Sequence, residues 1–502
     1  MKETVTALAA AAALAAASLS HAAPLAWTKA WTYNHAATGV TGQTSEILSF
    51  DALTQSLWVV GLKGVDVLGL GSGSLLQHID TSAFGEANSV AIFGGQAAVA
   101  MAAPVKTDLG SVRFYNTATR DLLGSTTVGA LPDMVAFTPD GSRLLVANEG
   151  EPSNLVDPRG SVSIIDVASR SVSATAGFSG NISFNGSHIR TFDGIQGGTT
   201  MDFEPEYIAV AADGSKAFVV LQEANAVATL DLGSNRITTV TGLGVKDFSL
   251  PGNEIDPTDR DYIVGNSGAT HQKLRSVDAR GFYMPDGMAS YTVGGQTFLV
   301  MANEGDARAD GEDETRAGDL GVTGERARLT VSSRESTAGD LYAFGARSFS
   351  IRDAAGHLVF DSGSKLDAEA IARGLYPVDN QGRDERSDNK GVEPEGVALA
   401  RIGDHTYAFI GLERAATGAV AVFDITDPAN ASFVDMIVTD GDLSPEGLVA
   451  FEYGGTAYLA IANEVSGTTT LYSISAVPEP GTYAMLLAGV GVVGWLARRR
   501  GG

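Results

Sequence analysis

The chain has no cysteine among its 502 residues. Disulfides, thiolate metal sites, iron–sulfur clusters and thiol nucleophiles are therefore excluded. Basic residues are also scarce, since 34 Lys and Arg stand against 59 Asp and Glu and the formal net charge is −25. A nucleic-acid-binding protein needs a basic face to neutralise phosphates, so we predict no nucleic-acid partner. The acidity favours cationic partners, metal ions above all.

Histidine is sparse, with 7 in the whole chain, and none of them is followed by Glu. The sequence therefore lacks the His-Glu pair that begins a common zinc-protease motif, and it also lacks the Gly-Lys pair of a P-loop. Nothing indicates Ser-His-Asp chemistry. The sequence favours a non-catalytic protein without deciding whether the protein is an enzyme. We predict no organic cofactor.

The N-terminus has the features of a secretory signal. Lys2 supplies a positive charge, and residues 5–19 form an apolar run. Ser20, His21 and Ala22 place small residues at the −3 and −1 positions of a cleavage site. We predict a signal peptide over residues 1–22 that is cleaved after Ala22.

The C-terminus carries a second signal, predicted over residues 477–502. Pro478, Glu479 and Pro480 precede an apolar run at 483–497, and three arginines follow at 498–500. The run is short for a full membrane span of about 20 residues, and the arginines would hold the cytoplasmic side. This tail resembles the PEP-CTERM sorting signal of Gram-negative bacteria. The resemblance implies processing by an exosortase after transient anchoring in the inner membrane.

Between the ends, residues 23–476 contain a repeat. Each unit begins with an acidic residue, usually after Pro, and an apolar strand. A turn, a second apolar strand that ends in an acidic residue, and a third strand follow. In the fifth unit we place the third strand at residues 340–344. The seven units start at residues 46, 88, 133, 206, 286, 395 and 446.

The shorter intervals between units, 42 and 45 residues, match one four-stranded propeller blade. The longer intervals predict insertions in or after the third, fourth and fifth units. Asp-Gly pairs at 140–141 and 213–214 fit tight turns between first and second strands. Helical periodicity is limited to a short candidate at 366–373. We predict an all-β fold, a seven-bladed β-propeller of the WD40/YVTN-like type with long loop insertions, rather than two β-sandwiches.

Five units pair an acidic residue before the first strand with one after the second. Because these strands are antiparallel, both carboxylates of a pair should lie on one face near the axis. The first two units carry Glu46 with Lys63 and Asn88 with Ala102 instead. The pairs are Asp133 and Glu149, Glu206 and Glu223, Asp286 and Glu304, Glu395 and Glu413, and Glu446 and Glu464.

Ten converging carboxylates repel one another and need cations, basic partners or raised pKa values. Oxygen-only ligands suit a hard cation, so a metal site would hold Ca²⁺ or Mg²⁺. The structural alternative is that the acids bind turn amides or bridge neighbouring blades, with Arg308, Lys390 and Arg414 as partners. Both interpretations stay open.

The long insertions hold three further acidic clusters, near residues 253–261, 306–314 and 384–389. None has the spacing of an EF-hand calcium loop with its terminal Glu. We therefore expect ordinary solvated loops.

Several longer segments carry a resemblance to a known family. They are SLPGNEIDPTDRD (249–261), MPDGMASY (284–291), MANEGDAR (301–308), DERSDNKGVEPEGVALA (384–400), and two more at 407–428 and 444–474. They resemble the choice-of-anchor I family, which is related to the mesenchyme-specific (MSP130-like) cell-surface glycoproteins. The resemblance implies an exported propeller at the cell surface or in the extracellular matrix.

Two functions follow as expectations. The first is a non-catalytic surface protein that binds a divalent cation and an exopolysaccharide or a surface protein. The alternative is a metal-dependent phosphohydrolase similar to propeller phytases and alkaline phosphatases. That chemistry requires basic residues free to hold phosphate beside the carboxylates, for which Arg308, Lys390 and Arg414 are the candidates.

Overall fold

The computed structural model describes residues 24–153, 156–191, 203–260, 272–308, 313–376 and 384–477. The predicted signal helix and the sorting helix lie outside these ranges, as do Pro478, Glu479 and Pro480 of the sorting signal. Within the described ranges, no helix has the length and apolar character that a membrane span requires.

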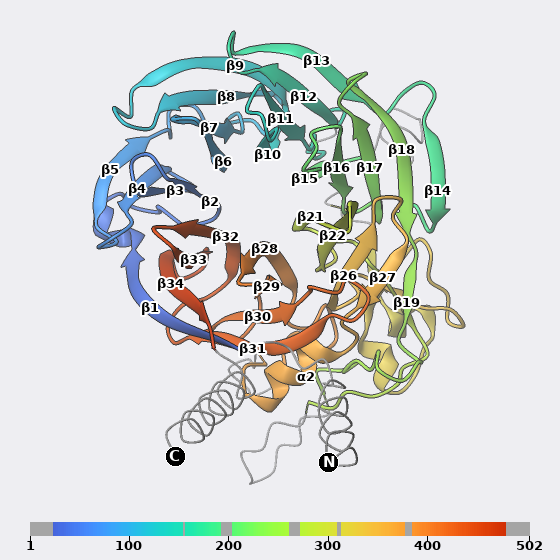
Figure 1. Cartoon of the computed structure of the whole chain (residues 1–502). Coiled ribbons are helices and arrows are strands. Elements are labelled where there is room, and N and C mark those ends of the chain that lie inside the picture. Colours follow the sequence, from blue (N-terminus) through green and yellow to red (C-terminus); the bar gives the residue numbers. More distant parts are fainter. Residues whose placement is uncertain are drawn as a thin grey trace, which may run out of the picture.

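The described residues form eight β-sheets, seven of which stand around a common axis (Figure 1). The first consists of β2 (Leu48–Asp51), β3 (Ser56–Gly61), β4 (Gly64–Gly69) and β5 (Leu75–Asp80). The second consists of β6 (Ala87–Phe93), β7 (Gln96–Met101), β8 (Leu109–Asn116) and β9 (Leu122–Ala130). The third consists of β10 (Pro132–Phe137), β11 (Arg143–Asn148), β12 (Ser161–Asp166) and β13 (Ser171–Gly177).

The remaining sheets of the ring follow the same order, with the first strand innermost. The fourth has β15 (Pro205–Val210), β16 (Lys216–Leu221), β17 (Ala226–Asp231), β18 (Arg236–Leu243) and a parallel edge strand, β14 (Ser183–Ser187). The fifth has β21 (Met288–Val293), β22 (Gln296–Asn303), β26 (Ser348–Asp353) and β27 (Leu358–Asp361). The sixth has β28 (Pro394–Ile402), β29 (His405–Leu412), β30 (Gly418–Asp424) and β31 (Ser432–Thr439).

The last sheet of the ring joins the two ends of the described chain. It consists of β32 (Pro445–Tyr453), β33 (Thr456–Asn463), β34 (Thr468–Ala476) and β1 (Leu25–Asn34). β1 pairs with β34 from Leu25 opposite Ala476 to Asn34 opposite Thr468. The repeat analysis did not identify β1, because its partner lies more than 400 residues away in sequence.

Contacts between the innermost strands run from β2 to β6, β10, β15, β21, β28 and β32, and from β32 back to β2. The strands therefore enclose a central channel, and the predicted β-propeller fold is confirmed. Each sheet packs against two neighbours, so its middle strands are apolar on both faces; all residues of β3 (SLWVVG) are buried.

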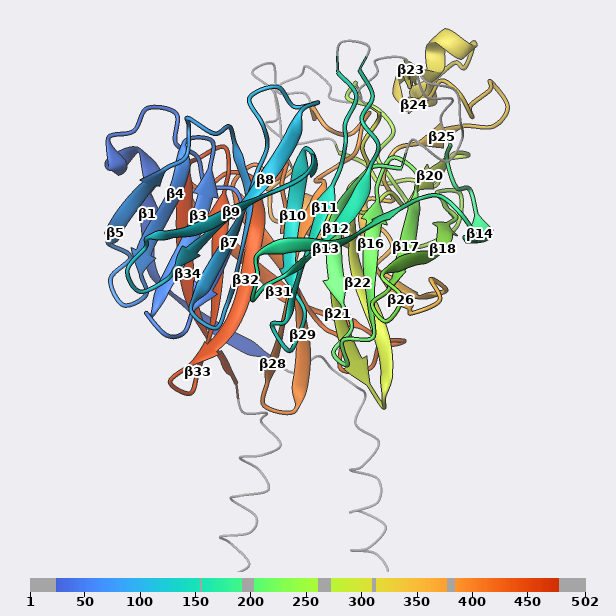
Figure 2. The same ribbon diagram turned by 90° about the horizontal axis from the view of Figure 1, so that it is seen from above.

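The eighth sheet belongs to the insertions and lies outside the ring (Figure 2). It consists of β19 (Val245–Asp247), β20 (Arg280–Phe282), β23 (Glu314–Arg316), β24 (Thr330–Ser332) and β25 (Tyr342–Ala343). The expected third strand at 340–344 is therefore wrong, because this segment pairs with β20 and β24. The third strand of that unit is β26, which pairs with β22.

Other local predictions are confirmed. The Asp-Gly pairs form the turns between β10 and β11 and between β15 and β16, and both glycines have φ of +67°. A helix, α2 (Lys365–Ala372), covers the predicted position. Short 3₁₀ helices add η1 (His35–Thr38), η2 (Ala317–Leu320) and η3 (Glu325–Arg328).

The expectation of solvated acidic loops is wrong for several residues. Asp256, Asp313 and Asp388 are buried. Asp256 pairs with Arg275 at 3.0 Å and Asp388 with Arg328 at 2.7 Å. A buried carboxylate requires such a partner, and these arginines stand far from the acids in sequence. Asp261, Asp310 and Glu312 lie outside the described residues.

Candidate metal centre at the acidic mouth of the channel

A repeated backbone corner places the acidic residues. Leu131, Glu393 and Ser444 each precede a Pro and have φ of 45–56°, which is rare for residues other than glycine. The carbonyl oxygen of each accepts the amide N–H of the second acid of its unit, Glu149, Glu413 or Glu464, at 2.9 Å. The corner therefore holds the end of the second strand beside the start of the first.

The first acid of four units lies at an irregularity of the strand pairing. The register shifts between Pro132 and Met134, around Asp133, and between Pro445 and Gly447, around Glu446. Similar shifts occur around Glu206 and Glu395. A residue at a bulge is released from the regular ladder, which re-aims its side chain. The predicted pairing of the two acids on one face follows from this geometry.

Glycine allows neighbouring first strands to approach closely. Gly287, Gly396 and Gly447 each follow the first acid of their unit. A Cβ atom on Gly396 would lie 2.1 Å from the carbonyl oxygen of Glu446, and one on Gly447 would lie 2.2 Å from that of Glu46. The side chain of any other residue is excluded there. The acids of successive units are thereby brought side by side.

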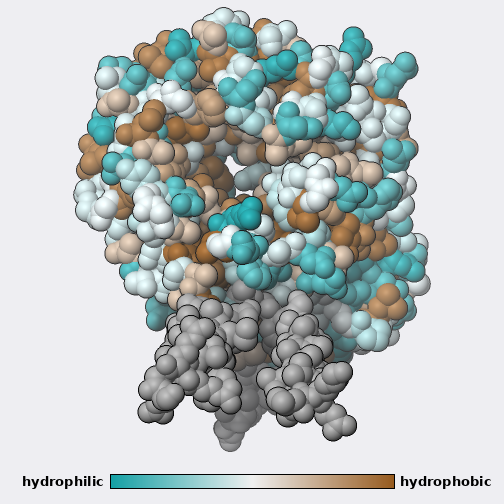
Figure 3. Space-filling view, viewed as in Figure 1, coloured by the Kyte–Doolittle hydropathy of each residue, from teal (hydrophilic) through white to brown (hydrophobic). Residues whose placement is uncertain are grey.

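The channel contains a cavity of about 580 Å³. Its acidic mouth, at the starts of the first strands, carries Asp133, Glu149, Glu206, Asp286, Glu395 and Glu446, and no Lys, Arg or His is among the described lining residues. Phe93 and Phe137 line the other end. Figure 3 shows the opening from that second face, with hydrophobic surface beside it. Four predicted residues, Glu223, Glu304, Glu413 and Glu464, are not among the lining residues.

Burial and mutual repulsion raise the pKa values of these acids. Burial raises the pKa of Asp133 to about 6 and that of Glu223 to about 7. Burial, with the charges of Glu304 and Glu393, raises the pKa of Glu413 to about 8. The pKa values of Glu149, Glu206, Asp286, Glu395 and Glu446 are also raised well above the usual range, first by burial and then by neighbouring carboxylates.

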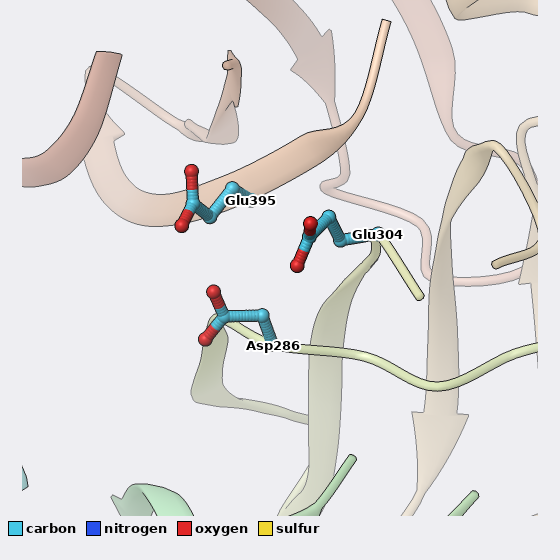
Figure 4. Close-up of side chains that lie close together, drawn as sticks. All are labelled: Asp286, Glu304 and Glu395. Carbon is cyan, nitrogen blue, oxygen red and sulfur yellow. The ribbon is translucent and has the colours of Figure 1, made fainter. Parts of the chain in front are cut away.

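Two groups of three carboxylates have the spacing of a metal site. Asp286, Glu304 and Glu395 each offer one oxygen within 4.8 Å of the others, and their side chains point towards one another (Figure 4). Glu304, Glu393 and Glu413 form the second group by the same measure. The structure thus brings four of the ten predicted acids into these groups, with Glu304 shared.

The three predicted basic residues all contact carboxylates. Lys390 Nζ lies 2.8 Å from Glu304 and 3.3 Å from Glu393. Arg414 lies 2.9 Å from Glu413. Arg308 is buried, 3.4 Å from Glu204 and 3.6 Å from Asp157. All three basic residues therefore lie where the structural alternative expects them, as partners of the acids.

The sequence analysis missed several members of the site. Glu204 and Glu393 are the first acids of two Glu-Pro-Glu sequences, and this local pattern could have marked them as members of the site. Glu46 was set aside as the partner of Lys63, but burial raises its pKa to about 7, with a contribution from Glu464. Gln222 donates from Nε2 to Glu304 at 2.9 Å, and no sequence pattern marked it.

The ends of the described chain lie on the opposite face from the carboxylates. β34 begins with Thr468 opposite Asn463, next to Glu464, and runs antiparallel to β33 until Ile474 lies opposite Ala457, near the β32–β33 turn. The amide of Val477 donates to the carbonyl oxygen of Pro24 at 3.0 Å. The acidic mouth therefore faces away from the point at which the predicted sorting segment begins.

Comparison with known proteins identifies both the repeat region and the tail. Residues 46–428 match the choice-of-anchor I domain. The chain belongs to the choice-of-anchor I family. Residues 476–500 match the PEP-CTERM protein-sorting motif. This choice-of-anchor I protein is accordingly an exported, cell-surface protein, and its motif implies processing by an exosortase.

A curated relative matches part of the chain. Gigasin-3a of Magallana gigas is 32% identical over 121 residues, which cover 21% of this choice-of-anchor I chain and 40% of Gigasin-3a. The chain thus spans less than half the length of that relative.

Two solved structures are similar to the described fold, although weakly. Hydrazine synthase of Kuenenia stuttgartiensis has a TM-score of 0.49 at 13% identity, covering 86% of this chain and 96% of that one. The β-propeller domain of Myceliophteria thermophila Cps50 (Swd1) has a TM-score of 0.44 at 9% identity, covering 88% and 98%. We draw no functional argument from either.

Proposed function

We propose that this exported surface protein binds a divalent cation at the acidic mouth of its channel, with Ca²⁺ as the preferred ion. The observation that carries the proposal is the group formed by Asp286, Glu304 and Glu395, whose oxygens lie within 4.8 Å of one another. Ca²⁺ binds carboxylate oxygens at about 2.3–2.6 Å, so oxygens on opposite sides of the ion stand up to about 5 Å apart. Three carboxylates from two neighbouring sheets satisfy that spacing, and water would complete the shell.

The electrostatics of the mouth support the same proposal. The pKa values of Asp286 and Glu395 are raised because each carboxylate loses water and stands beside others. A bound divalent cation would reverse this effect, because it stabilises the ionised forms. Lys390 already supplies one positive charge to Glu304, so a metal ion would share or replace that contact.

The cation would link the protein to its surroundings. We propose transient anchoring of the sorting segment in the inner membrane, followed by display or release outside the cell. Because the mouth faces away from Val477, a bound Ca²⁺ would stay open to the medium on that face. Carboxylates of an acidic exopolysaccharide or of a surface protein are suitable further ligands for such an ion.

The phosphohydrolase alternative gains no support from the geometry. It requires basic side chains free to hold phosphate beside the metal. Arg308, Lys390 and Arg414 all contact carboxylates, as described above. We therefore propose a non-catalytic role.

Calcium titration of the purified protein tests the proposal. After chelation, thermal unfolding and calorimetry are measured with increasing CaCl₂, and with MgCl₂ for comparison. A site that binds only the folded state adds about 2.7 kcal/mol of stability at a free ion concentration 100-fold above Kd. We expect a clear rise of the unfolding midpoint with Ca²⁺.

Two glutamine variants make the test specific. Glu304→Gln removes a carboxylate common to both three-acid groups and should abolish the calcium response. Glu464→Gln is the matched control, because Glu464 holds the equivalent repeat position but belongs to neither group. No shift at millimolar Ca²⁺, or an equal loss in both variants, would contradict the proposal.

A further inference from the structure

The channel is larger and more apolar than a metal ion requires. A cavity of about 580 Å³ has the size of a small-molecule site, and such sites combine apolar walls with a few placed polar groups. Below the acidic mouth the walls are formed by apolar side chains of the first strands. These include Val90, Ile92, Phe93, Phe137, Leu448 and Val449.

One side of the mouth differs from the rest. Gly287, Gly396 and Gly447 directly follow the first acids of the fifth, sixth and seventh units, where the neighbouring backbone leaves no room for a Cβ atom. At the same repeat position the third and fourth units carry Met134 and Tyr207, and both residues are part of the cavity lining. On this side the lining beside Asp133 and Glu206 therefore includes larger residues, although Met134 Sδ already accepts the amide N–H of Ile208 at 3.3 Å.

Tyr207 stands among negative charges. It is half-buried, and the carboxylates of Asp286 and Asp133 contribute, after burial, to a rise of its pKa to about 12. The hydroxyl therefore stays neutral, and Tyr207 contributes an aromatic residue to the cavity lining beside these carboxylates. An aromatic face next to carboxylates is the recognised environment for an organic ammonium group.

Glu206 supplies an unsatisfied acceptor at this place. Its side chain lines the cavity, yet the residue is only 9% exposed. Its Oε2 atom has no hydrogen-bond partner among the described residues. A buried carboxylate oxygen without a donor is costly, and a ligand that donates a hydrogen bond to it would remove that cost.

We propose that the channel binds an alkylammonium group between Asp133, Glu206 and Tyr207, with the apolar stem of the ligand directed along Phe137 and its neighbours. This ligand class is distinct from the metal ion proposed above. Ca²⁺ needs six to eight oxygen ligands, and Met134, the ring of Tyr207 and the Phe side chains provide none. The ammonium comes either from a free amine or from the side chain of a lysine in another protein.

Binding measurements with simple probes test the proposal. n-Butylammonium chloride is titrated into the chelated protein at pH 8 by calorimetry, with n-butanol as the neutral probe of similar shape. The peptides acetyl-Gly-Lys-Gly-amide and acetyl-Gly-norleucine-Gly-amide test the protein source in the same way. We expect saturable binding of at least one of the two ammonium probes and none of the neutral probes.

Variants separate this site from the metal centre. Glu206→Gln should weaken ammonium binding about tenfold or more, because a charge-assisted hydrogen bond is lost. The same variant should keep its calcium response. Glu304→Gln should lose the calcium response and keep ammonium binding. Glu206→Gln also removes repulsion from a buried acid, so we expect it to fold at least as stably as the natural chain.

The outcomes are distinct. Binding of butylammonium identifies a free amine as a ligand, and binding of the lysine peptide alone assigns the site to a protein side chain. No binding of either ammonium probe at millimolar concentration would overturn the proposal. Equal binding of the neutral probes, or unchanged binding in Glu206→Gln, would overturn it as well, whatever the calcium titration shows.

Discussion

Lys390 Nζ lies 2.8 Å from Oε1 of Glu304, at the place where the two groups of three carboxylates meet. Gln222 donates to the other oxygen of the same carboxylate at 2.9 Å. The chain therefore places one positive charge and one neutral donor on the carboxylate that the two groups share. This arrangement lets the protein fold with the mouth intact before any external cation arrives.

Replacing that lysine should make the fold depend on added calcium. Lys390→Met removes the cation from Glu304, while Glu393 keeps Arg386 and Arg414. Removing one partner of a buried ion pair costs about 3–5 kcal/mol. We expect a lower unfolding midpoint in chelator and a larger recovery with Ca²⁺ than in the natural chain. Thermal unfolding with and without CaCl₂ measures both effects.

Lys106→Met is the matched control for this experiment. Lys106 lies 3.5 Å from Glu151, and its side chain is 54% exposed. An exposed pair contributes about 0–1 kcal/mol, so this variant should unfold close to the natural chain. Equal effects of the two substitutions would show that Lys390 has no special role in the mouth.

The repeated strands and acids of the propeller could be predicted from the sequence, whereas the parts without a repeat could not. The first strands, their acids and the Asp-Gly turns have local signatures that recur from unit to unit. β1 has no such signature, because its place is set by pairing with β34 at the other end of the chain. The segment at 340–344 was misplaced because an insertion forms its own sheet with distant strands.

The site was predictable to a similar extent. The spacing of the acids in each unit showed which carboxylates approach one face. It did not show which of them meet, because that depends on how neighbouring sheets pack. The pairing of Arg308 with Glu204, 104 positions apart, is a tertiary contact without any local pattern. Only the Glu-Pro-Glu sequences offered an unused local signal for Glu204 and Glu393.

The free protein should lose stability as the pH rises. Burial raises the pKa of Glu46 and Glu223 to about 7 from an ordinary value of 4.5. Between those values the folded state binds more protons than the unfolded state, so the free energy of unfolding falls with rising pH. The stability present below pH 4.5 is lost as the pH passes through about 7.

Unfolding midpoints in chelator at pH 5, 6, 7 and 8 measure this dependence. We expect the highest midpoint at the acidic end. Saturating Ca²⁺ should flatten the profile, because a bound cation favours ionised carboxylates. A midpoint that rises from pH 5 to pH 8 in chelator would contradict the assignment of these raised pKa values.

A buried histidine should stabilise the contacts that close the ring of sheets. His35 follows β1, and its Nδ1 lies 2.5 Å from Asp66 while its Nε2 lies 2.8 Å from Oγ1 of Thr469. All three side chains are buried, and they join β1, the first sheet and the last sheet. We expect His35→Ala to lower the free energy of unfolding by about 1–3 kcal/mol, because a buried hydrogen-bond partner is lost while His78 still pairs with Asp66 at 2.7 Å.

His405→Ala provides the comparison for the closure. His405 also pairs with an aspartate, Asp424, at 2.7 Å, but its side chain is 38% exposed and lies within one sheet. Its removal should cost about 1 kcal/mol or less. Denaturant unfolding measures the free energy of unfolding of both variants. Equal decreases would show that His35 does not stabilise the closure of the ring.

The close approach of the first strands should tolerate no added side chain. A Cβ atom at Gly396 would lie 2.1 Å from the backbone oxygen of Glu446, which no side-chain rotation can relieve. We expect Gly396→Ala to destabilise the fold by about 1–3 kcal/mol, as overpacking does. It should also weaken calcium binding, because Glu395 and Glu446 would be pushed apart. Gly71→Ala is the control, since a Cβ there meets nothing within 4 Å and the change should cost about 0.5 kcal/mol or less. Thermal unfolding and calcium titration of both variants would contradict the close-packed mouth if Gly396→Ala behaved like Gly71→Ala.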